Sequence, residues 1–139
     1  MSFLLDTNVV SEWVKPRPNP GLIRWIEAAD EDRIFISVIS LAELRYGVAR
    51  LAAGKRRQRL DDWLRHELPL RFEGRILPVD LKVADAWGRT VSRSEESGRP
   101  MGAMDAFLAA TAEVHRLTLV TRNVSDFAGL KSVLNPWES

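Results

Sequence analysis

The chain has 139 residues, of which 45% are hydrophobic, and this fits one domain. Its formal net charge is only +1, so any contact with nucleic acid must come from a local patch. It has no cysteine, which excludes disulfides, thiolate metal sites and a cysteine nucleophile. Because no apolar run reaches ~20 residues and residues 1–6 lack the basic region of a signal peptide, we expect a cytoplasmic protein.

Short apolar runs and helical patterns alternate along the chain. From the N-terminus they predict a strand at 3–5, a helix capped by 6–8, a helix opening at Asn19-Pro20, a strand at 34–36, a helix at 40–53 and a basic helix after Gly54. The second half predicts a strand at 75–79, a helix from 83 to 91 that frays by 97–100, a buried helix at 103–115, a strand at 118–120 and a candidate fifth strand at 132–134.

This alternation indicates right-handed βαβ units. The predicted fold class is therefore α/β, a single domain with a parallel sheet of four to five strands and helices on both faces. Ligands of such sheets bind outside the carboxyl ends of the strands. Asp6 follows the first strand, residues 121–123 follow the fourth, and the loop at 98–102 leads into the buried helix.

Two acids lie on predicted helices in unusual surroundings. Asp105 has no cation within a helical turn, and a buried carboxylate there costs several kcal/mol unless it is paired. The alternative is an exposed acid that the helix dipole favours in a first turn. Glu43 lies at the edge of an apolar stripe, with Gly47 one turn later leaving open space, or else it is a solvated acid bound to Arg50.

Two further acids follow strands. Asp6 is either an N-cap or a residue of a site at the sheet edge, and Asp126 is either a turn residue or a member of the same site. Together with the two helical acids they would form a cluster of hard oxygen ligands, which select Mg²⁺ or Mn²⁺. Such ions activate water and neutralise the charge on an attacked phosphate, so phosphodiester cleavage suits the cluster.

The order of these motifs resembles the PIN-domain family, and within it the VapC-type toxins of bacterial toxin–antitoxin pairs. The matching stretches are LLDTNVVSE at 4–12, ISLAELRYG at 39–47, DAFLAATA at 105–112, TRN at 121–123 and DF at 126–127. GRILP at 74–78 and NPW at 135–137 resemble the FitB-like branch. The resemblance thus covers the chain from end to end.

The resemblance implies which residues carry the chemistry. It makes Asp6, Glu43 and Asp105 the catalytic acids, with Asp6 and Asp105 as ligands of Mg²⁺ or Mn²⁺, and Thr7 and Asn8 as supporting polar groups. One departure is visible, since many PIN domains carry a fourth acid where this chain has Asn123. Asp126 either replaces that acid in catalysis or only caps the next turn, and the sequence leaves both open.

The implied activity is that of a type II toxin, a metal-dependent endoribonuclease in which metal-activated water cleaves RNA. Residues 1–139 would form one PIN domain. The implied partners are an RNA substrate, a cognate antitoxin, a second copy in a homodimer, and a larger assembly with antitoxin on DNA, with no membrane contact. One alternative is a catalytically weak PIN-fold module acting through its antitoxin and DNA, which Asn123 favours. A phosphatase on a similar sheet would need paired acids after the first strand, and this chain has one.

Several other residues have simpler interpretations. Neither His66 nor His115 has a carboxylate placed to orient it, so neither is expected to be a general base. The basic stretch, Lys55, Arg56, Arg57 and Arg59, is a solvated face, a guide for RNA, or a contact for an acidic partner. The five tryptophans are expected to pack in the core.

Overall fold

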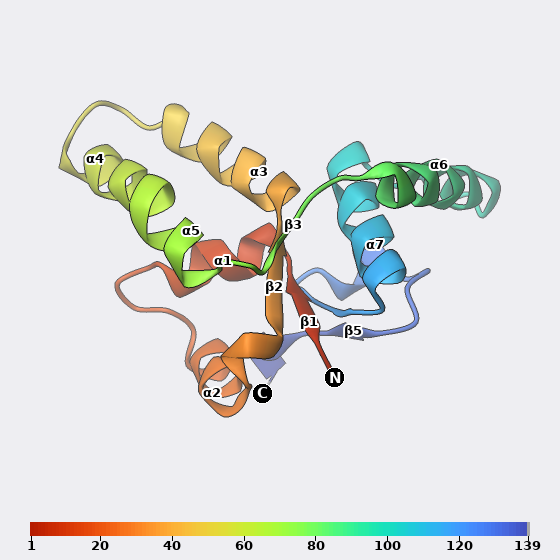
Figure 1. The fold of residues 1–139 in the computed structure, drawn as a ribbon, viewed down its shortest axis with the longest axis horizontal. Helices are drawn as coiled ribbons and strands as arrows, with labels where there is room; N and C mark the ends of the chain where they lie inside the picture. The colour runs from red at the N-terminus through yellow and green to blue at the C-terminus, as the bar shows by residue number, and fades with distance from the viewer. Residues whose placement is uncertain (139) are drawn as a thin grey trace.

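A five-stranded parallel sheet lies at the centre of the computed structural model, which describes residues 1–138 (Figure 1). The strands are β1 (Phe3–Leu5), β2 (Ile34–Ser37), β3 (Ile76–Leu77), β4 (Thr118–Val120) and β5 (Val133–Leu134), in the order β3-β2-β1-β4-β5. Phe3 of β1 is opposite Ile34 of β2 and Thr118 of β4. The parallel sheet and its fifth strand are confirmed, while the predicted domain end at Ser139 lies outside the described residues.

The helices connect these strands in chain order. They are α1 (Thr7–Trp13), α2 (Pro20–Ala28), α3 (Val38–Ala49), α4 (Lys55–Asp62), α5 (Leu68–Arg71), α6 (Leu81–Glu96) and α7 (Ala103–His115). Short single turns at Glu31–Arg33, Val124–Phe127 and Pro136–Glu138, and a π-helical turn at Trp63–Glu67 between α4 and α5, complete the described chain. None of these helices is both long and apolar enough to cross a membrane.

The two faces of the sheet are covered by different helices. Alternate residues of a strand point to opposite faces, so Leu5 packs in a core with α1, α2, α3 and α5, whereas Leu4 packs against α7. The same alternation separates Ile34 and Ile36 from Phe35 on β2. The prediction of helices on both faces is therefore confirmed.

Helix α7 is the buried helix that its alanine-rich sequence predicts. Ala106 and the run from Leu108 to Ala112 are buried, and Ala110 packs against Val83 and Ala86 of α6. The rings of Trp87 and Phe107 stack at 5.2 Å between the same two helices. This packing fixes the first turn of α7 relative to the sheet edge.

Several element boundaries differ from the prediction, and the two largest differences have a physical reason. The helix predicted at 40–53 is α3, which begins at Val38 because the Ser37 hydroxyl caps it by accepting from the Ile39 amide at 3.0 Å. It ends at Ala49, so Gly54 does not end it and instead directly precedes α4. The strand predicted at 75–79 is only Ile76–Leu77, since Pro78 has no amide proton to extend the ladder.

Candidate active site

The centre of the candidate site is Asp6, at the carboxyl end of β1. Asp6 is 6% exposed, and its side chain accepts three hydrogen bonds. Oδ1 accepts from the Thr7 amide at 2.6 Å, while Oδ2 accepts from the Thr121 hydroxyl at 2.8 Å and from the Asn8 amide group at 3.3 Å. Asp6 is thus the N-cap of α1 and also lies at the sheet edge, so its two interpretations are compatible.

Burial raises the pKa of the Asp6 carboxyl above its ordinary value. The hydrogen bonds from Thr121 and Thr7 act in the opposite direction, and the charges of Glu43 and Asp126 raise the pKa further. The net direction is upward. A cation close to this carboxyl would stabilise its ionised form.

Glu43 on α3 faces Asp6 across the start of α1. The Thr7 hydroxyl donates to Glu43 Oε1 at 2.6 Å and lies 2.9 Å from the Ser40 hydroxyl. Arg50 does not pair with Glu43, because its guanidinium lies over the Tyr46 ring at 5.3 Å. The alternative of a solvated Glu43 bound to Arg50 is therefore wrong. A Cβ built on Gly47 meets nothing within 4 Å, so the space beside this helix is open.

Asp105 approaches the same place from the first turn of α7. Its pKa is raised to about 6, first by burial and then by the charges of Asp6, Asp126 and Glu43. Three acids from other elements therefore act on one carboxyl. The position in a first turn agrees with the alternative of an acid favoured by the helix dipole, but the raised pKa shows that burial and the neighbouring charges together outweigh that effect.

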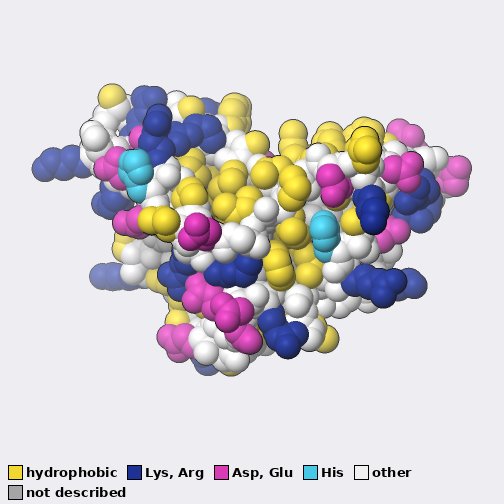
Figure 2. Space-filling view, viewed as in Figure 1, with side chains coloured by type: hydrophobic (Ala, Val, Ile, Leu, Met, Phe, Trp, Pro, Cys, Tyr) yellow, Lys and Arg dark blue, Asp and Glu magenta, His cyan; other side chains and the backbone are white. Residues whose placement is uncertain are grey.

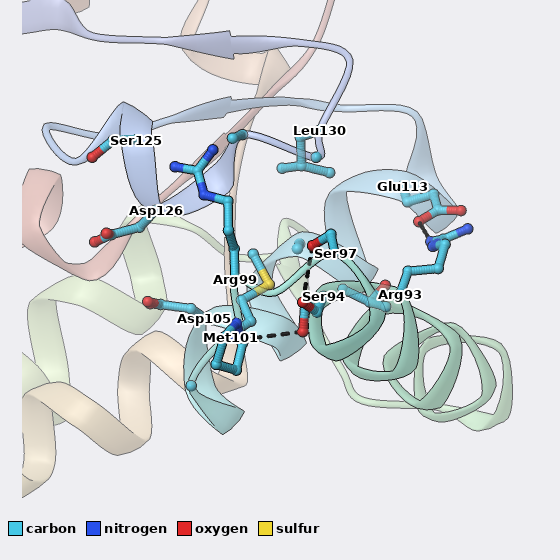
Figure 3. A pocket seen from close by; sticks show the side chains of 16 residues that line it. Arg93, Ser94, Ser97, Arg99, Met101, Asp105, Glu113, Ser125, Asp126 and Leu130 are labelled. Atoms are coloured by element: carbon cyan, nitrogen blue, oxygen red, sulfur yellow. Dashed lines mark hydrogen bonds and ion pairs between the residues drawn. The ribbon is translucent and has the colours of Figure 1, made fainter.

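Asp126 lies close enough to act on the charges of this group, whereas the Asn123 side chain forms no capping hydrogen bond in the same turn. Asp126 lies in the turn Val124–Phe127, and its charge raises the pKa of both Asp6 and Asp105. In Figure 3 the carboxylates of Asp105 and Asp126 point to the same side of the view. The Asn123 amide proton goes to the Thr121 hydroxyl at 3.0 Å, and its exposed side chain does not cap the turn.

The donor set fits a hydrated divalent cation. Within residues 1–138, no three Asp, Glu or His side chains already surround a single point. Magnesium sites in proteins commonly use one or two carboxylates and keep several waters, so a complete protein cage is not needed. Asp6 and Asp105 offer hard oxygen atoms whose ionised forms are disfavoured without a cation.

A cavity of about 650 Å³ opens beside these acids. It lies between the end of α6, one side of α7 and the segment 125–130, and Asp105 and Asp126 form part of its wall (Figure 3). Asp6 and Glu43 are not among its lining residues. The acid cluster, which is Asp6, Glu43, Asp105 and Asp126, therefore lies at an edge of the cavity and not at its centre.

The residues expected to be structural lie apart from the acids. His66 and His115 are exposed and do not line this cavity. The tryptophans pack against core residues, as predicted. The basic stretch is exposed on α4, and Figure 2 shows Lys and Arg side chains gathered over the arm that α3 and α4 form.

Residues 121–123 were expected at the sheet edge, but the contacts of two polar side chains of the site were not predicted. Thr121 donates to Asp6, and Ser40 contacts the Thr7 hydroxyl that holds Glu43. The Thr121 contact could have been found, because β4 neighbours β1 and the first residue after each strand meets at the sheet edge. Ser40 lies one helical turn before Glu43, which is a weaker signal.

Comparison with known proteins agrees with this architecture. Residues 3–130 match the family model described as the PIN domain. The chain is 41% identical to Toxin FitB of Neisseria gonorrhoeae over 135 residues, covering 96% of this chain and 97% of that protein. It is 39% identical to VapC ribonuclease Y4jK of Sinorhizobium fredii over 137 residues, covering 97% of each.

A solved structure extends the similarity to three dimensions. The structure of FitAB bound to an IR36 DNA fragment contains a chain that is 37% identical, with a TM-score of 0.89. The match covers 97% of this chain and 95% of that one.

Proposed function

Because this chain belongs to the PIN-domain family, we propose that it is a metal-dependent endoribonuclease and the toxin of a type II toxin–antitoxin pair. The names of its relatives support both parts, since one is a toxin and another is a VapC ribonuclease. The proposed domain comprises residues 1–139.

The observation that carries the proposal is the mutual repulsion of four acids at one sheet edge. Asp105 has its pKa raised to about 6 by burial and by Asp6, Asp126 and Glu43. A purely structural carboxylate would be stabilised by a nearby cation or by several amide protons. A cation bound between these carboxylates would offset their repulsion, so the arrangement suits a metal site.

Each acid has a proposed role that follows from its contacts. Asp6 and Asp105 would hold Mg²⁺ or Mn²⁺, and a bound ion would neutralise charge on the attacked phosphate and lower the pKa of water. Glu43 is held at Oε1 by the Thr7 hydroxyl, so its Oε2 accepts a proton from the attacking water. Asp126 is exposed at the rim and contributes negative charge there.

The experiment that tests the activity is cleavage of single-stranded RNA by the purified chain. We expect EDTA to abolish cleavage and added Mg²⁺ or Mn²⁺ to restore it. Glu43→Gln should lower the rate by about 100-fold or more. Glu27→Gln is the matched control, because Glu27 is an exposed acid on α2 that does not line the cavity. Cleavage that persists in EDTA would contradict the proposal.

The proposed partners follow from the family and from the FitAB complex on DNA. They are a cognate antitoxin that blocks the acid cluster, a second copy in a homodimer, and DNA bound through the antitoxin, all in the cytoplasm. Co-expression with the product of a small neighbouring reading frame tests this. A stable complex without RNA cleavage is expected, and unchanged cleavage after co-purification would contradict it.

A further inference from the structure

The cavity beside the acids has features that the acids alone do not explain. Its volume, about 650 Å³, lies within the range of small-ligand sites, about 300–1,000 Å³. Asp105 and Asp126 form part of its wall. A group that fills the cavity is therefore in contact with the acid cluster.

Arg99 is the cation of this cavity that has no partner. Its guanidinium forms no hydrogen bond or ion pair with the residues that the structure describes, whereas Arg93 on the same wall pairs with Glu113 at 3.2 Å. Figure 3 shows Arg99 extended from the α6–α7 connection toward the segment that carries Ser125 and Leu130. A free guanidinium offers its planar set of donors to the phosphate of a bound nucleotide.

The rest of the wall combines apolar and polar groups. Met101 and Leu130 supply apolar surface, and the Thr90 hydroxyl is the one buried side-chain oxygen in residues 1–138 that lacks a hydrogen-bond partner. An unmade hydrogen bond of this kind is unfavourable, and because the hydroxyl is buried, a ligand in the cavity can reach it only if the side chain turns toward the cavity. A nucleobase has the same combination of an apolar face and a polar edge.

We propose that this cavity binds one unpaired nucleotide of the substrate next to the cleaved bond, with Arg99 as the residue that positions it. The inference rests on the proposed ribonuclease function. A base enters a cavity of this kind only when it is unstacked, so the site selects single-stranded or looped RNA. It also makes cleavage depend on the nucleotide beside the bond, and so the cavity contributes to sequence preference.

The first test compares two arginine variants that lose the same charge. Arg99→Ala should lower kcat/KM for RNA cleavage by about 10- to 100-fold, the loss expected for one charge-assisted contact. Arg89→Ala is the control, because Arg89 lies on α6 outside the cavity and pairs only with Asp85. Arg99→Lys keeps the charge but loses the planar donors, so it should restore activity only in part.

A modified substrate tests whether a base occupies the cavity. Two substrates are compared, each with an abasic ribose in place of one of the two nucleotides that flank the cleaved bond. The unmodified enzyme should cleave one of these two substrates with a lower kcat/KM than intact RNA. Gly129→Leu fills the cavity without a clash at Cβ, since a Cβ there meets nothing within 4 Å. This variant should cleave intact and abasic RNA equally slowly.

Measuring RNA binding under conditions that prevent cleavage separates this inference from the proposed function. For single-stranded RNA in EDTA, Arg99→Ala should flatten the slope of log affinity against log salt by about 0.7, and Arg89→Ala should not. If the unmodified chain binds RNA in this way but never cleaves it, the proposed function fails and only the nucleotide-binding part of the inference stands. If the chain cleaves RNA and Arg99→Ala matches Arg89→Ala in kinetics, abasic discrimination and salt slope, the inference is wrong and the proposed function stands.

Discussion

Replacing Asp105 by asparagine should stabilise the metal-free protein while abolishing its activity. The change deletes one charge from the acid cluster and keeps the shape of the side chain. In the folded protein the pKa of Asp105 is raised to about 6, compared with an ordinary value of 3.8. Between these values the folded state binds more protons than the unfolded state. Stability of the unmodified protein therefore falls as pH rises through this window.

The size of the effect follows from the two pKa values. At about 1.4 kcal/mol per pH unit, their difference corresponds to at most about 3 kcal/mol. Asp105 is partly exposed, so solvent screening reduces this to about 1–2 kcal/mol. Asp105→Asn should accordingly raise Tm in EDTA at pH 7.5 by about 3–8 °C. The gain should disappear below about pH 3, where the aspartate is protonated in both states.

Melting curves in EDTA and in Mn²⁺ measure both parts of this prediction. Mn²⁺ at 100 times its Kd should raise the free energy of unfolding of the unmodified protein by about 2.7 kcal/mol, and its Tm accordingly. The Tm of the variant should rise much less. Glu27→Gln is again the control and should leave the EDTA Tm nearly unchanged. If Asp105→Asn melts lower than the unmodified protein in EDTA, Asp105 is a structural cap and the repulsion argument is wrong.

Three further changes test other parts of the structure. Thr121→Val removes the donor at 2.8 Å from Asp6, so it should lower the free energy of unfolding by about 1–3 kcal/mol in urea, and an unchanged value would show that this bond is weak. Gly47→Ala should add about 0.5–1 kcal/mol, because the new Cβ meets nothing within 4 Å, and a loss of stability would reveal an unseen clash. Reversing the charges of Lys55 and Arg57 should weaken RNA binding and its salt dependence if α4 guides RNA, or abolish only the antitoxin complex if α4 meets that partner. No change in either assay would leave α4 as a solvated face.

The sheet and the position of its acids were predictable from the sequence. Strand residues 3–5 and 118–120 are short apolar runs bounded by polar residues, and the rule for carboxyl ends then places Asp6 and Thr121 together. Element boundaries were less predictable. α3 begins two residues earlier than expected because Ser37 caps it, a choice between Ser37 and Ser40 that periodicity does not resolve.

The alternatives left open by the sequence were decided by contacts between distant segments. Whether Glu43 pairs with Arg50 or faces the site depends on Thr7, which is 36 residues away. Whether Asp126 approaches the acids depends on how the segment after β4 folds beside α7. The cavity and the unpaired Arg99 could not be predicted, because they arise from three segments whose spacing is set by packing of α6 on α7.

The central claim is that Asp6 and Asp105 hold the cation on which RNA cleavage depends. Titration of the purified chain with Mn²⁺, followed by electron paramagnetic resonance and by RNA cleavage in the same samples, tests this claim most directly. We predict that binding and cleavage rise together with one midpoint, and that both are lost in Asp6→Asn and Asp105→Asn. Cleavage that reaches its full rate before Mn²⁺ binds, or Mn²⁺ binding that survives both substitutions, would contradict the account.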